Sequence, residues 1–440
     1  MKTSLERVKQ LAESDKKLRF NNLLHNLTVE SVRSKISKIC ATSATGVDGM
    51  TKEMALQVTE NDLQELINSV HRCAYKAPPV RRVYIPKPGK TEKRPIGIPT
   101  VLDRALQSAV TDILSAIYEN DFLEFSYGGR PRISAHHALS KLHETVAYKR
   151  TGFVFEADLK NFFGSLDHTW MLKFLSHRIS DTRILNVISR WLKAGVLENA
   201  SVQSTENGVP QGGSISVILS NIYLHYVLDL WLSKVVTPRM RGPLQVVRYL
   251  DDFVICVQYK SDADKIQKVI PLRLQKFGLE LEPNKTQLVR FGRFSREGVA
   301  KFNEGKQKSI TFLGFDFIPV SHLNGKFRVQ MQTNRHRLNR FLQGIKFSIR
   351  KNQHHAIKDQ MMSINQKLRG HFNYFGIYGN TARIQKVRYE TLLYFRKVLC
   401  HRSQNGKVTW DKMNHILKVI PMAEAKLRLP YAQFKALSSV

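Results

Sequence analysis

Residues 246–257 read VVRYLDDFVICV, and this stretch decides how the rest of the chain is interpreted. Two apolar runs flank Leu250, Asp251 and Asp252, a pattern that predicts two short strands joined by a tight hairpin with carboxylates at its tip. A further carboxylate, Asp158, follows the apolar run at residues 153–157, which predicts a buried strand. An isolated Asp-Asp pair more often belongs to an ordinary solvated turn, so its surroundings must decide its role.

Acidic residues at the ends of buried strands are costly unless a cation meets them. Phosphoryl transfer by the two-metal route needs a few carboxylates that converge on two Mg²⁺ ions about 3.5 to 4 Å apart, one beside the attacking 3′ oxygen and one beside the leaving pyrophosphate. A strand that ends in Asp158 and a hairpin tip with Asp251 and Asp252 would provide such a set. The sequence therefore predicts that these three carboxylates bind metal.

The charge of the chain indicates a polyanionic partner. Its 440 residues include 69 Lys and Arg against 36 Asp and Glu, a formal net charge of +33. The 42% hydrophobic content is typical of a folded protein, so the excess charge is expected on the surface of globular domains. Closely spaced phosphates offset such a charge, which favours a nucleic acid; a basic protein that merely stays soluble is the alternative.

Several function classes are disfavoured. The four cysteines, Cys40, Cys73, Cys256 and Cys400, form no C-x-x-C pair, which argues against zinc ribbons, redox dithiols and a disulfide framework. The first residues lack the apolar run of a secretory signal, and no uncharged stretch is a credible membrane span. We expect a cytoplasmic protein of the bacterial cytosol or nucleoid, without a membrane partner.

Periodicity and turn residues predict the remaining elements. The first 77 residues are expected to be helical from about residue 4, with a turn-forming loop at residues 45–49. A basic hairpin is expected at residues 79–100, followed by a helix with Asp103 as its N-cap. The other expected elements are a helix from about Thr169, an apolar helix after the loop at residues 207–214, a hairpin at residues 311–318 and basic helices beyond about Gln330.

Three groups of residues suggest a nucleotide pocket. The basic hairpin could fold over a triphosphate, although such a cluster alone is more often a solvated face. The loop with Gln211 and Gly212 could bring its backbone close to a nucleotide, because glycine permits close approach. Phe162 or Phe163 could stand against a sugar ring and exclude a 2′ hydroxyl, although adjacent phenylalanines are usually part of a core. The hairpin's basic residues are Arg81, Arg82, Lys87, Lys90 and Arg94.

In their order and content, these blocks resemble the reverse transcriptases encoded by group II introns and their group II-like bacterial relatives. The resemblance covers roughly residues 46–318. The matching motifs are ATGVDGMT, RRVYIPKPGKTEKRPIGIPTVLDRALQ, SYGGRPRISAHHAL, FEADLKNFFGSLDH, NGVPQGGSISVILSNIYL, RYLDDFVI, NKTQLVRFG and FLGFDF. Further on, INQKLRGHFNYFGIYGN and the region of Trp410 look like the thumb and maturase segment of that family.

The resemblance implies an α+β fold with a right-hand polymerase architecture. Fingers and palm would combine an antiparallel sheet with helices, and a thumb and maturase-like C-terminal domain would be α-helical. The implied domains are a helical N-terminal extension with the GVDG loop at residues 1–77, the fingers and palm at residues 78–325, and a basic thumb and maturase-like segment, or domain X, at residues 326–440.

The resemblance also implies roles for individual residues. Asp158, Asp251 and Asp252 would be the catalytic triad and, with Leu159, the site of two Mg²⁺ ions, for which Mn²⁺ could substitute. Phe163 would be the first and Phe162 the second candidate for the sugar gate. The other residues that would bind the incoming dNTP are Arg82, Lys87, Arg94, Gln211 and Gly212. Those that would contact nucleic acid are Gly46, Asp48, Arg130, Lys285, the primer grip at Leu313 and Gly314, and, in the basic helices, Arg335, Arg337, Arg340, Lys346, Arg350 and Lys351.

The sequence departs from the family pattern at two positions in particular. Leu250 stands where a small residue is commonest, and Gly129 stands where an aromatic residue is usual. No paired-cysteine, histidine-rich endonuclease module is visible, so a second nuclease activity is not expected. The departures from the family pattern argue against ordinary intron mobility.

The predicted function is an RNA-directed DNA polymerase that adds dNTPs to a 3′ hydroxyl on an RNA template; the expected partners are a structured RNA, a DNA primer or product, and dNTPs. One alternative is an RNA-binding intron maturase or splicing factor in which polymerisation is secondary. Another is a domesticated reverse transcriptase that acts in antiphage defence or DNA repair.

Overall fold

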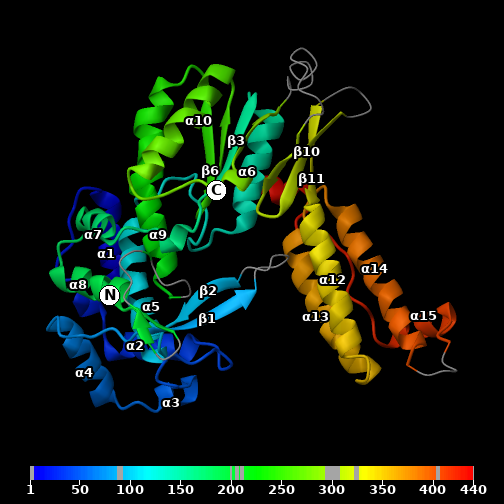
Figure 1. Cartoon of the computed structure of the whole chain (residues 1–440), viewed down its shortest axis with the longest axis horizontal. Helices are drawn as coiled ribbons and strands as arrows, with labels where there is room; N and C mark the ends of the chain where they lie inside the picture. Colours follow the sequence, from blue (N-terminus) through cyan, green and yellow to red (C-terminus); the bar gives the residue numbers. More distant parts are fainter. Residues whose placement is uncertain are drawn as a thin grey trace. The chain divides into compact units, whose positions relative to one another are not determined.

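The computed structural model describes most of the chain (Figure 1). The described residues are 4–86, 93–198, 201–203, 208, 213–292, 308–321, 327–402 and 407–439. The chain divides into two compact units, each drawn from three segments. The first unit comprises Met1–Ser134, Ala157–Phe253 and Ser261–Gln287, and the second comprises Ala135–Glu156, Val254–Lys260 and Leu288–Val440.

The N-terminal part of the first unit is helical, as predicted. Its helices are α1 (Ser4–Ser14), α2 (Val29–Lys38), α3 (Lys52–Leu56) and α4 (Glu60–His71). Helices α2, α3 and α4 have threonine N-caps: the side chains of Thr28, Thr51 and Thr59 each accept a hydrogen bond from a backbone N–H in the first turn. Helices α1 and α2 both pack on α5 (Val101–Tyr118), the long cyan helix of Figure 1.

The predicted hairpin before α5 is confirmed. Strands β1 (Val80–Pro86) and β2 (Lys93–Ile98) pair antiparallel, and they belong to a sheet of order β2-β1-β4-β5 with β4 (Val196–Glu198) and β5 (Ser201–Gln203).

The N-cap predicted for α5 is wrong by three residues. The cap is Thr100, whose hydroxyl accepts a hydrogen bond from the backbone N–H of Asp103 at 3.2 Å. Asp103 lies within the first turn and is only 3% exposed. Its carboxylate accepts hydrogen bonds from other parts of the fold and is therefore not available to cap the helix.

A second four-stranded sheet carries the predicted carboxylates. Its order is β6-β7-β3-β8, with β6 (Leu244–Tyr249), β7 (Asp252–Val257), β3 (Phe153–Asp158) and β8 (Gln287–Arg290). Most residues of β3 and β7 are buried, which explains their continuous apolar runs. The hairpin with Leu250 and Asp251 at its tip and the strand that ends in Asp158 are both confirmed.

The remaining helices between residues 168 and 275 are α7 (His168–Ser176), α8 (Thr182–Lys193), α9 (Ser216–Leu224) and α10 (Lys260–Gln275). Helix α9 continues through π-helical turns at His225–Asp229 and Leu232–Val236. The helices predicted near Thr169 and after the loop at residues 207–214 are thus confirmed. Short 3₁₀ turns lie at Leu24–Asn26, Phe162–Gly164, Thr237–Arg239, Pro283–Lys285 and Leu437–Ser439.

The second unit joins a three-stranded antiparallel sheet to a helical core. The sheet has the order β11-β10-β9, with β9 (Ile310–Phe312), β10 (Phe315–Ser321) and β11 (Phe327–Thr333). The predicted hairpin at residues 311–318 is confirmed, whereas the basic helices start only at Arg335, because β11 runs to Thr333 and Asn334 caps the next helix. The helices are α6 (Ala135–Tyr148), α12 (Arg335–Lys351), α13 (Ile357–Phe375), α14 (Thr381–Cys400), α15 (Trp410–Val419) and α16 (Tyr431–Ala436).

The predicted α+β class is confirmed, because helices and antiparallel strands build both units. The three-part division at residues 77 and 325 stays a prediction. Among the described residues, no helix is both long enough and apolar enough to cross a membrane.

Candidate active site

The three predicted catalytic carboxylates come from neighbouring strands. Asp158 ends β3, and Asp251 and Asp252 lie where β6 turns into β7, the strand that pairs with β3. The turn before them is unusual, because Leu250 has a φ of 56°, in the left-handed region that a branched side chain rarely adopts. Its surroundings must therefore stabilise this backbone conformation.

The electrostatics of this region favour a bound cation. The pKa of Asp251 is raised, first by burial and then by the negative charge of Asp158, whereas the positive charges of Lys285 and Arg94 lower it. The Lys285 ammonium donates a hydrogen bond to Asp158 Oδ2. Burial is the largest single effect and lowers the pKa of Lys285, but the hydrogen bond to Asp158 and the negative charges of the three carboxylates together outweigh it, so the pKa is raised. Lys285 thus supplies part of the positive charge that offsets these carboxylates.

A short backbone contact brings Lys285 to this place. The N–H of Glu282 donates to the carbonyl of Asp158 at 2.8 Å, so the 3₁₀ turn Pro283–Lys285 follows directly beside the end of β3. Lys285 was predicted to contact nucleic acid. The structure places it against a predicted metal ligand, a contact between residues 127 positions apart.

The predicted metal ligands Asp158, Asp251 and Asp252 suit a hard divalent cation. All three are carboxylates, without thiol or imidazole groups among them, and carboxylate oxygens are the ligands that Mg²⁺ prefers. Within the described ranges, no group of three or more His, Cys, Asp or Glu side chains is close enough to form a ready-made metal site. The fit therefore rests on the repulsion between Asp158 and Asp251, which a cation would relieve. The side chain of Leu159 has no ligand atom, so only its backbone carbonyl could take part.

The register of the β1–β2 hairpin separates its arginines. Ile85 lies opposite Arg94, and residues opposite each other in an antiparallel pair point to the same face. Because side chains alternate along a strand, Arg81 shares that face with Arg94, whereas Arg82 lies on the other. Arg94 is exposed and close enough to lower the pKa of Asp251. Lys87 and Lys90 lie outside the described residues.

The two candidate sugar-gate residues differ in exposure. Phe162 is 2% exposed and belongs to the core, whereas Phe163 is partly exposed. The chain approaches this turn closely at Gly208, where an added Cβ would lie 2.9 Å from the carbonyl oxygen of Phe163. The Gly208 carbonyl also accepts a hydrogen bond from His168 Nε2 at 2.7 Å. Gln211 and Gly212, three and four positions later, lie outside the described residues.

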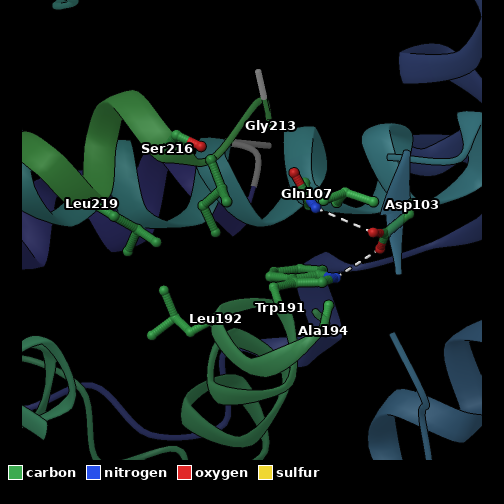
Figure 2. A pocket seen from close by; sticks show the side chains of 10 residues that line it. Asp103, Gln107, Trp191, Leu192, Ala194, Gly213, Ser216 and Leu219 are labelled. Atoms are coloured by element: carbon green, nitrogen blue, oxygen red, sulfur yellow. Dashed lines mark hydrogen bonds between the residues drawn. The ribbon is translucent and has the colours of Figure 1, made fainter. Parts of the chain in front are cut away.

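The sequence analysis missed a buried polar cluster in the first unit. Figure 2 shows Asp103 hydrogen-bonded to Trp191 and Gln107; Trp191 Nε1 donates at 2.6 Å and Gln107 Nε2 at 3.2 Å. Tyr75 Oη also donates to Asp103, at 2.6 Å. Asp103, Gln107 and Trp191, with Gly213, border a cavity of about 10 Å³, room for about one water molecule. Tyr75 follows α4, Asp103 and Gln107 belong to α5, and Trp191 belongs to α8, so the cluster connects these three parts of the first unit. Gly213, which borders the cavity, lies two positions after Gln211.

This cluster predicts a pH-dependent stability. Burial raises the pKa of Asp103 to about 6. In the unfolded chain the pKa of this carboxyl is near ~4, so the folded state favours the protonated form more strongly than the unfolded state does. The contribution of Asp103 to the free energy of unfolding is therefore full below about pH 4 and is lost as the pH rises through about 6. Asp103→Asn should abolish this loss, because asparagine does not ionise. The variant should keep the hydrogen bonds from Tyr75 and Trp191, since both donate to Oδ1, which asparagine retains. Between pH values of about 4 and 7, the wild type should lose on the order of 3 kcal/mol relative to the variant. Urea unfolding of both proteins across this pH range measures the difference, and a difference that does not change with pH would contradict the prediction.

The predicted primer grip is a strained turn between β9 and β10. Leu313 has a φ of 48° and Gly314 a φ of 86°. Tyr374 Oη donates to the Leu313 carbonyl at 2.8 Å, and the N–H of Asn334 donates to the Gly314 carbonyl at 3.0 Å. Arg337 covers Gly314, where an added Cβ would lie 2.7 Å from its Cδ.

The basic residues of α12 lie mainly on its exposed face. Leu338, Leu342, Ile345 and Ile349 point into the helical core at three- and four-residue spacing. Lys346 is paired with Glu390 at 3.6 Å, so part of its charge is offset within the protein. The exposed basic residues of the helix are Arg335, Arg337, Arg340, Arg350 and Lys351.

Arg130, also predicted to contact nucleic acid, points into the protein. Its Nε donates to Glu119 Oε2 at 2.8 Å, and its other nitrogens donate to the backbone carbonyls of Leu123, Ser126 and Glu119. These contacts indicate a structural role.

The GVDG loop is held at its first glycine. An added Cβ at Gly46 would lie 2.6 Å from the Cα of Thr100, the cap of α5, so the loop approaches this helix start closely. Asp48 Oδ1 accepts a hydrogen bond from the N–H of Met50 at 3.1 Å, within the turn.

Comparison with known proteins adds the family. Residues 85–317, which are 233 of the 440, match the model of the reverse transcriptase (RNA-dependent DNA polymerase) family. The chain is similar to the group II intron-encoded protein LtrA of Lactococcus lactis subsp. cremoris, with 29% identity over 420 residues, 78% of this chain and 68% of LtrA. It is also similar to protein YkfC of Escherichia coli, with 37% identity over 233 residues, 50% of this chain and 61% of YkfC.

More distant similarity extends to nuclear intron maturase 3 of Arabidopsis thaliana, with 25% identity over 178 residues, 36% of this chain and 24% of the maturase. The match to the family model spans more than half of the chain and includes the strands with Asp158, Asp251 and Asp252. The chain therefore belongs to the reverse transcriptase family of RNA-dependent DNA polymerases and is similar to its group II intron-encoded members.

Proposed function

We propose that this reverse transcriptase adds dNTPs to a 3′ hydroxyl on an RNA template, with Asp158, Asp251 and Asp252 holding two Mg²⁺ ions. The observation that carries the proposal is the origin of these carboxylates on two paired strands, where Asp251 is close enough to Asp158 for the two charges to interact. Bound divalent ions would favour deprotonation of the 3′ hydroxyl and stabilise the charge on the leaving pyrophosphate. Mn²⁺ offers the same preference for oxygen ligands and could replace Mg²⁺.

The residues of the chain would bind and orient the substrates. The charge of Arg94 reaches Asp251, which supports the proposal that Arg94 neutralises the triphosphate of an incoming dNTP. Phe163 has the exposed surface that a sugar gate needs, and the core position of Phe162 leaves it a supporting role. Lys285 would keep Asp158 neutralised until a cation binds there.

We infer that a structured RNA is the partner of the basic C-terminal helices. The exposed arginines of α12 offer phosphate contacts, and the net charge of +33 gives the whole chain affinity for polyanions. Two similarities favour an intron maturase role as the second candidate: the chain is similar to a nuclear intron maturase, and its similarity to the group II intron-encoded protein LtrA covers 78% of the chain and thus extends beyond the polymerase match. Roles in antiphage defence or DNA repair stay predictions.

A primer-extension assay tests the proposal. The purified, nuclease-treated protein is given a DNA-primed RNA template, dNTPs and Mg²⁺, beside an Asp251→Ala, Asp252→Ala double variant. We expect incorporation by the wild type, its loss on chelation of Mg²⁺, and none by the variant. Incorporation by the variant would overturn the assigned metal ligands. Its absence in the wild type, on this template and on RNA that copurifies with the protein, would overturn the polymerase assignment and favour the maturase role.

A further inference from the structure

Arg248 is a fully buried arginine two residues before the turn that carries the catalytic carboxylates. It is 0% exposed, as is its partner Asp229, to which it donates at 2.7 and 2.5 Å. Its remaining N–H groups donate to Ser126 Oγ at 2.6 Å, Asn221 Oδ1 at 3.1 Å and the Leu250 carbonyl at 3.2 Å. Every N–H of the guanidinium therefore has a partner within the protein.

The bond to Leu250 connects this network to the active site. The Leu250 carbonyl belongs to the peptide that joins Leu250 to Asp251, and Leu250 has the left-handed backbone conformation described above. A hydrogen bond from a rigid, fully engaged guanidinium restricts the rotation of that peptide. The hydrogen bond from Arg248 thereby fixes the direction in which the backbone continues from Leu250 to Asp251.

A second set of contacts restrains the same turn. Asn221 Nδ2 donates to the Gly128 carbonyl at 2.7 Å, which holds Gly128 beside Leu250. An added Cβ at Gly128 would lie 2.5 Å from the Leu250 nitrogen and 2.8 Å from its Cγ. The Leu250 side chain also reaches Gly129, where an added Cβ would lie 3.5 Å from Leu250 Cδ2. Leu250 is thus in contact with the Gly128-Gly129 backbone.

The π-helical turn after α9 helps to assemble the network. Asn221 and Asp229 are eight positions apart, and in a continuous α-helix they would differ by roughly 80° around the axis. The π-helical turn His225–Asp229 places more residues in one turn and so reduces this difference. Both side chains then reach one guanidinium, in keeping with the tendency of π-helical turns to occur at functional sites.

We infer that Arg248, held by Asp229 and Asn221, is a positioning residue that sets the orientation of the Asp251 and Asp252 carboxylates for DNA synthesis. The inference rests on the catalytic roles proposed above for these two residues. A buried ion pair is weak evidence for stability, because apolar residues of similar size often replace such a pair without loss. Stability alone therefore does not account for a charged pair at this place, whereas an oriented hydrogen bond to the Leu250 carbonyl does.

A matched pair of double variants separates positioning from stability. The first is Arg248→Met, Asp229→Leu. The control is Arg178→Met, Asp121→Leu, which removes another buried ion pair of the first unit, 2.9 Å long with side chains 3% and 8% exposed. Thermal unfolding, RNA binding and steady-state dNTP incorporation are measured for both. Both variants should fold and bind RNA, and the first alone should lose about 100-fold in kcat, with KM for dNTP nearly unchanged, as expected for misplaced catalytic groups.

The contrary results are equally specific. A folded first variant with normal kcat, or an equal loss of kcat in the control, would overturn the inference. If the first variant does not fold, Arg248→Lys replaces it, since lysine keeps the charge but cannot make all the guanidinium contacts. A folded Arg248→Lys protein should then show the same loss of kcat, and normal kcat would overturn the inference. Asp252→Ala is assayed in parallel: if it retains synthesis, the proposed function itself fails and this inference falls with it.

Discussion

Replacing Asp251 or Asp252 by asparagine should reduce DNA synthesis at least about 1000-fold, since a carboxylate that holds a catalytic metal is worth several kcal/mol of transition-state stabilisation. Asparagine has nearly the same shape as aspartate but lacks the charge. The loss should appear in kcat, at saturating dNTP and template, with RNA binding unchanged. Single-nucleotide incorporation measures it, and Glu124→Gln, an exposed site in the same unit, should retain full activity.

The same change at Asp251 should stabilise the metal-free protein. The pKa of Asp251 is raised by burial and then by Asp158, so its ionised form is unfavourable in the folded state. For a raised carboxyl pKa, the stabilising contribution is present below the unfolded pKa and is lost as the pH rises through the folded value. Asp251→Asn should therefore raise Tm at neutral pH without Mg²⁺, and the gain should shrink towards pH values of about 4. A lower Tm at neutral pH, or retained synthesis, would contradict the assignment.

The secondary structure and the positions of the three candidate carboxylates at the strand ends could be predicted because their signals are local. The apolar runs around Leu250 and before Asp158 fall within single strands, and the turn residues mark where each strand ends. Whether Asp251 faces Asp158 depends on strand order, which the family resemblance implied and periodicity did not. The structure supplies it through the pairing of β7 with β3.

Contacts between distant residues could not be predicted in this way. Lys285 looked like a nucleic-acid contact, but a backbone bond far along the chain brings it to Asp158. In the sequence, Asp103 fits the pattern of a helix N-cap. Only the folded structure shows that its carboxylate instead accepts hydrogen bonds from Tyr75 and Trp191, which are distant in the sequence. The charge of Arg130 carries no sign that its donors are satisfied internally.

Two departures from the family pattern become one feature in the structure. In the sequence, Leu250 and Gly129 are separate exceptions, one larger and one smaller than usual. In the fold, the Leu250 side chain lies against Gly128 and Gly129, and an added Cβ at Gly129 would also lie 2.2 Å from Val217 Cγ1. The large side chain of Leu250 thus lies where Gly128 and Gly129 have no side chains. This complementarity makes the glycines a sensitive test of the site.

Gly128→Ala should cost about 100-fold in DNA synthesis, the loss typical of a displacement of catalytic groups by about 1 Å. Its Cβ would lie 2.5 Å from the Leu250 nitrogen and 2.9 Å from the Tyr249 carbonyl carbon. Both are backbone atoms, so no side-chain rotation relieves the clash, and the turn that carries Asp251 must shift. Overpacking of this kind should also destabilise the fold by roughly 1–3 kcal/mol.

Gly370→Ala is the matched control. Gly370 lies within α13, and, apart from its chain neighbours and the backbone of its own helix, no atom of the described residues lies within 4 Å of an added Cβ. Because alanine favours a helix over glycine by about 1 kcal/mol, this variant should have an equal or higher Tm and full activity. Incorporation rates, Tm and template binding are compared for the two variants. Normal synthesis by a folded Gly128→Ala protein would show that the turn tolerates displacement, and the position of the Leu250–Asp251 peptide would then not limit catalysis.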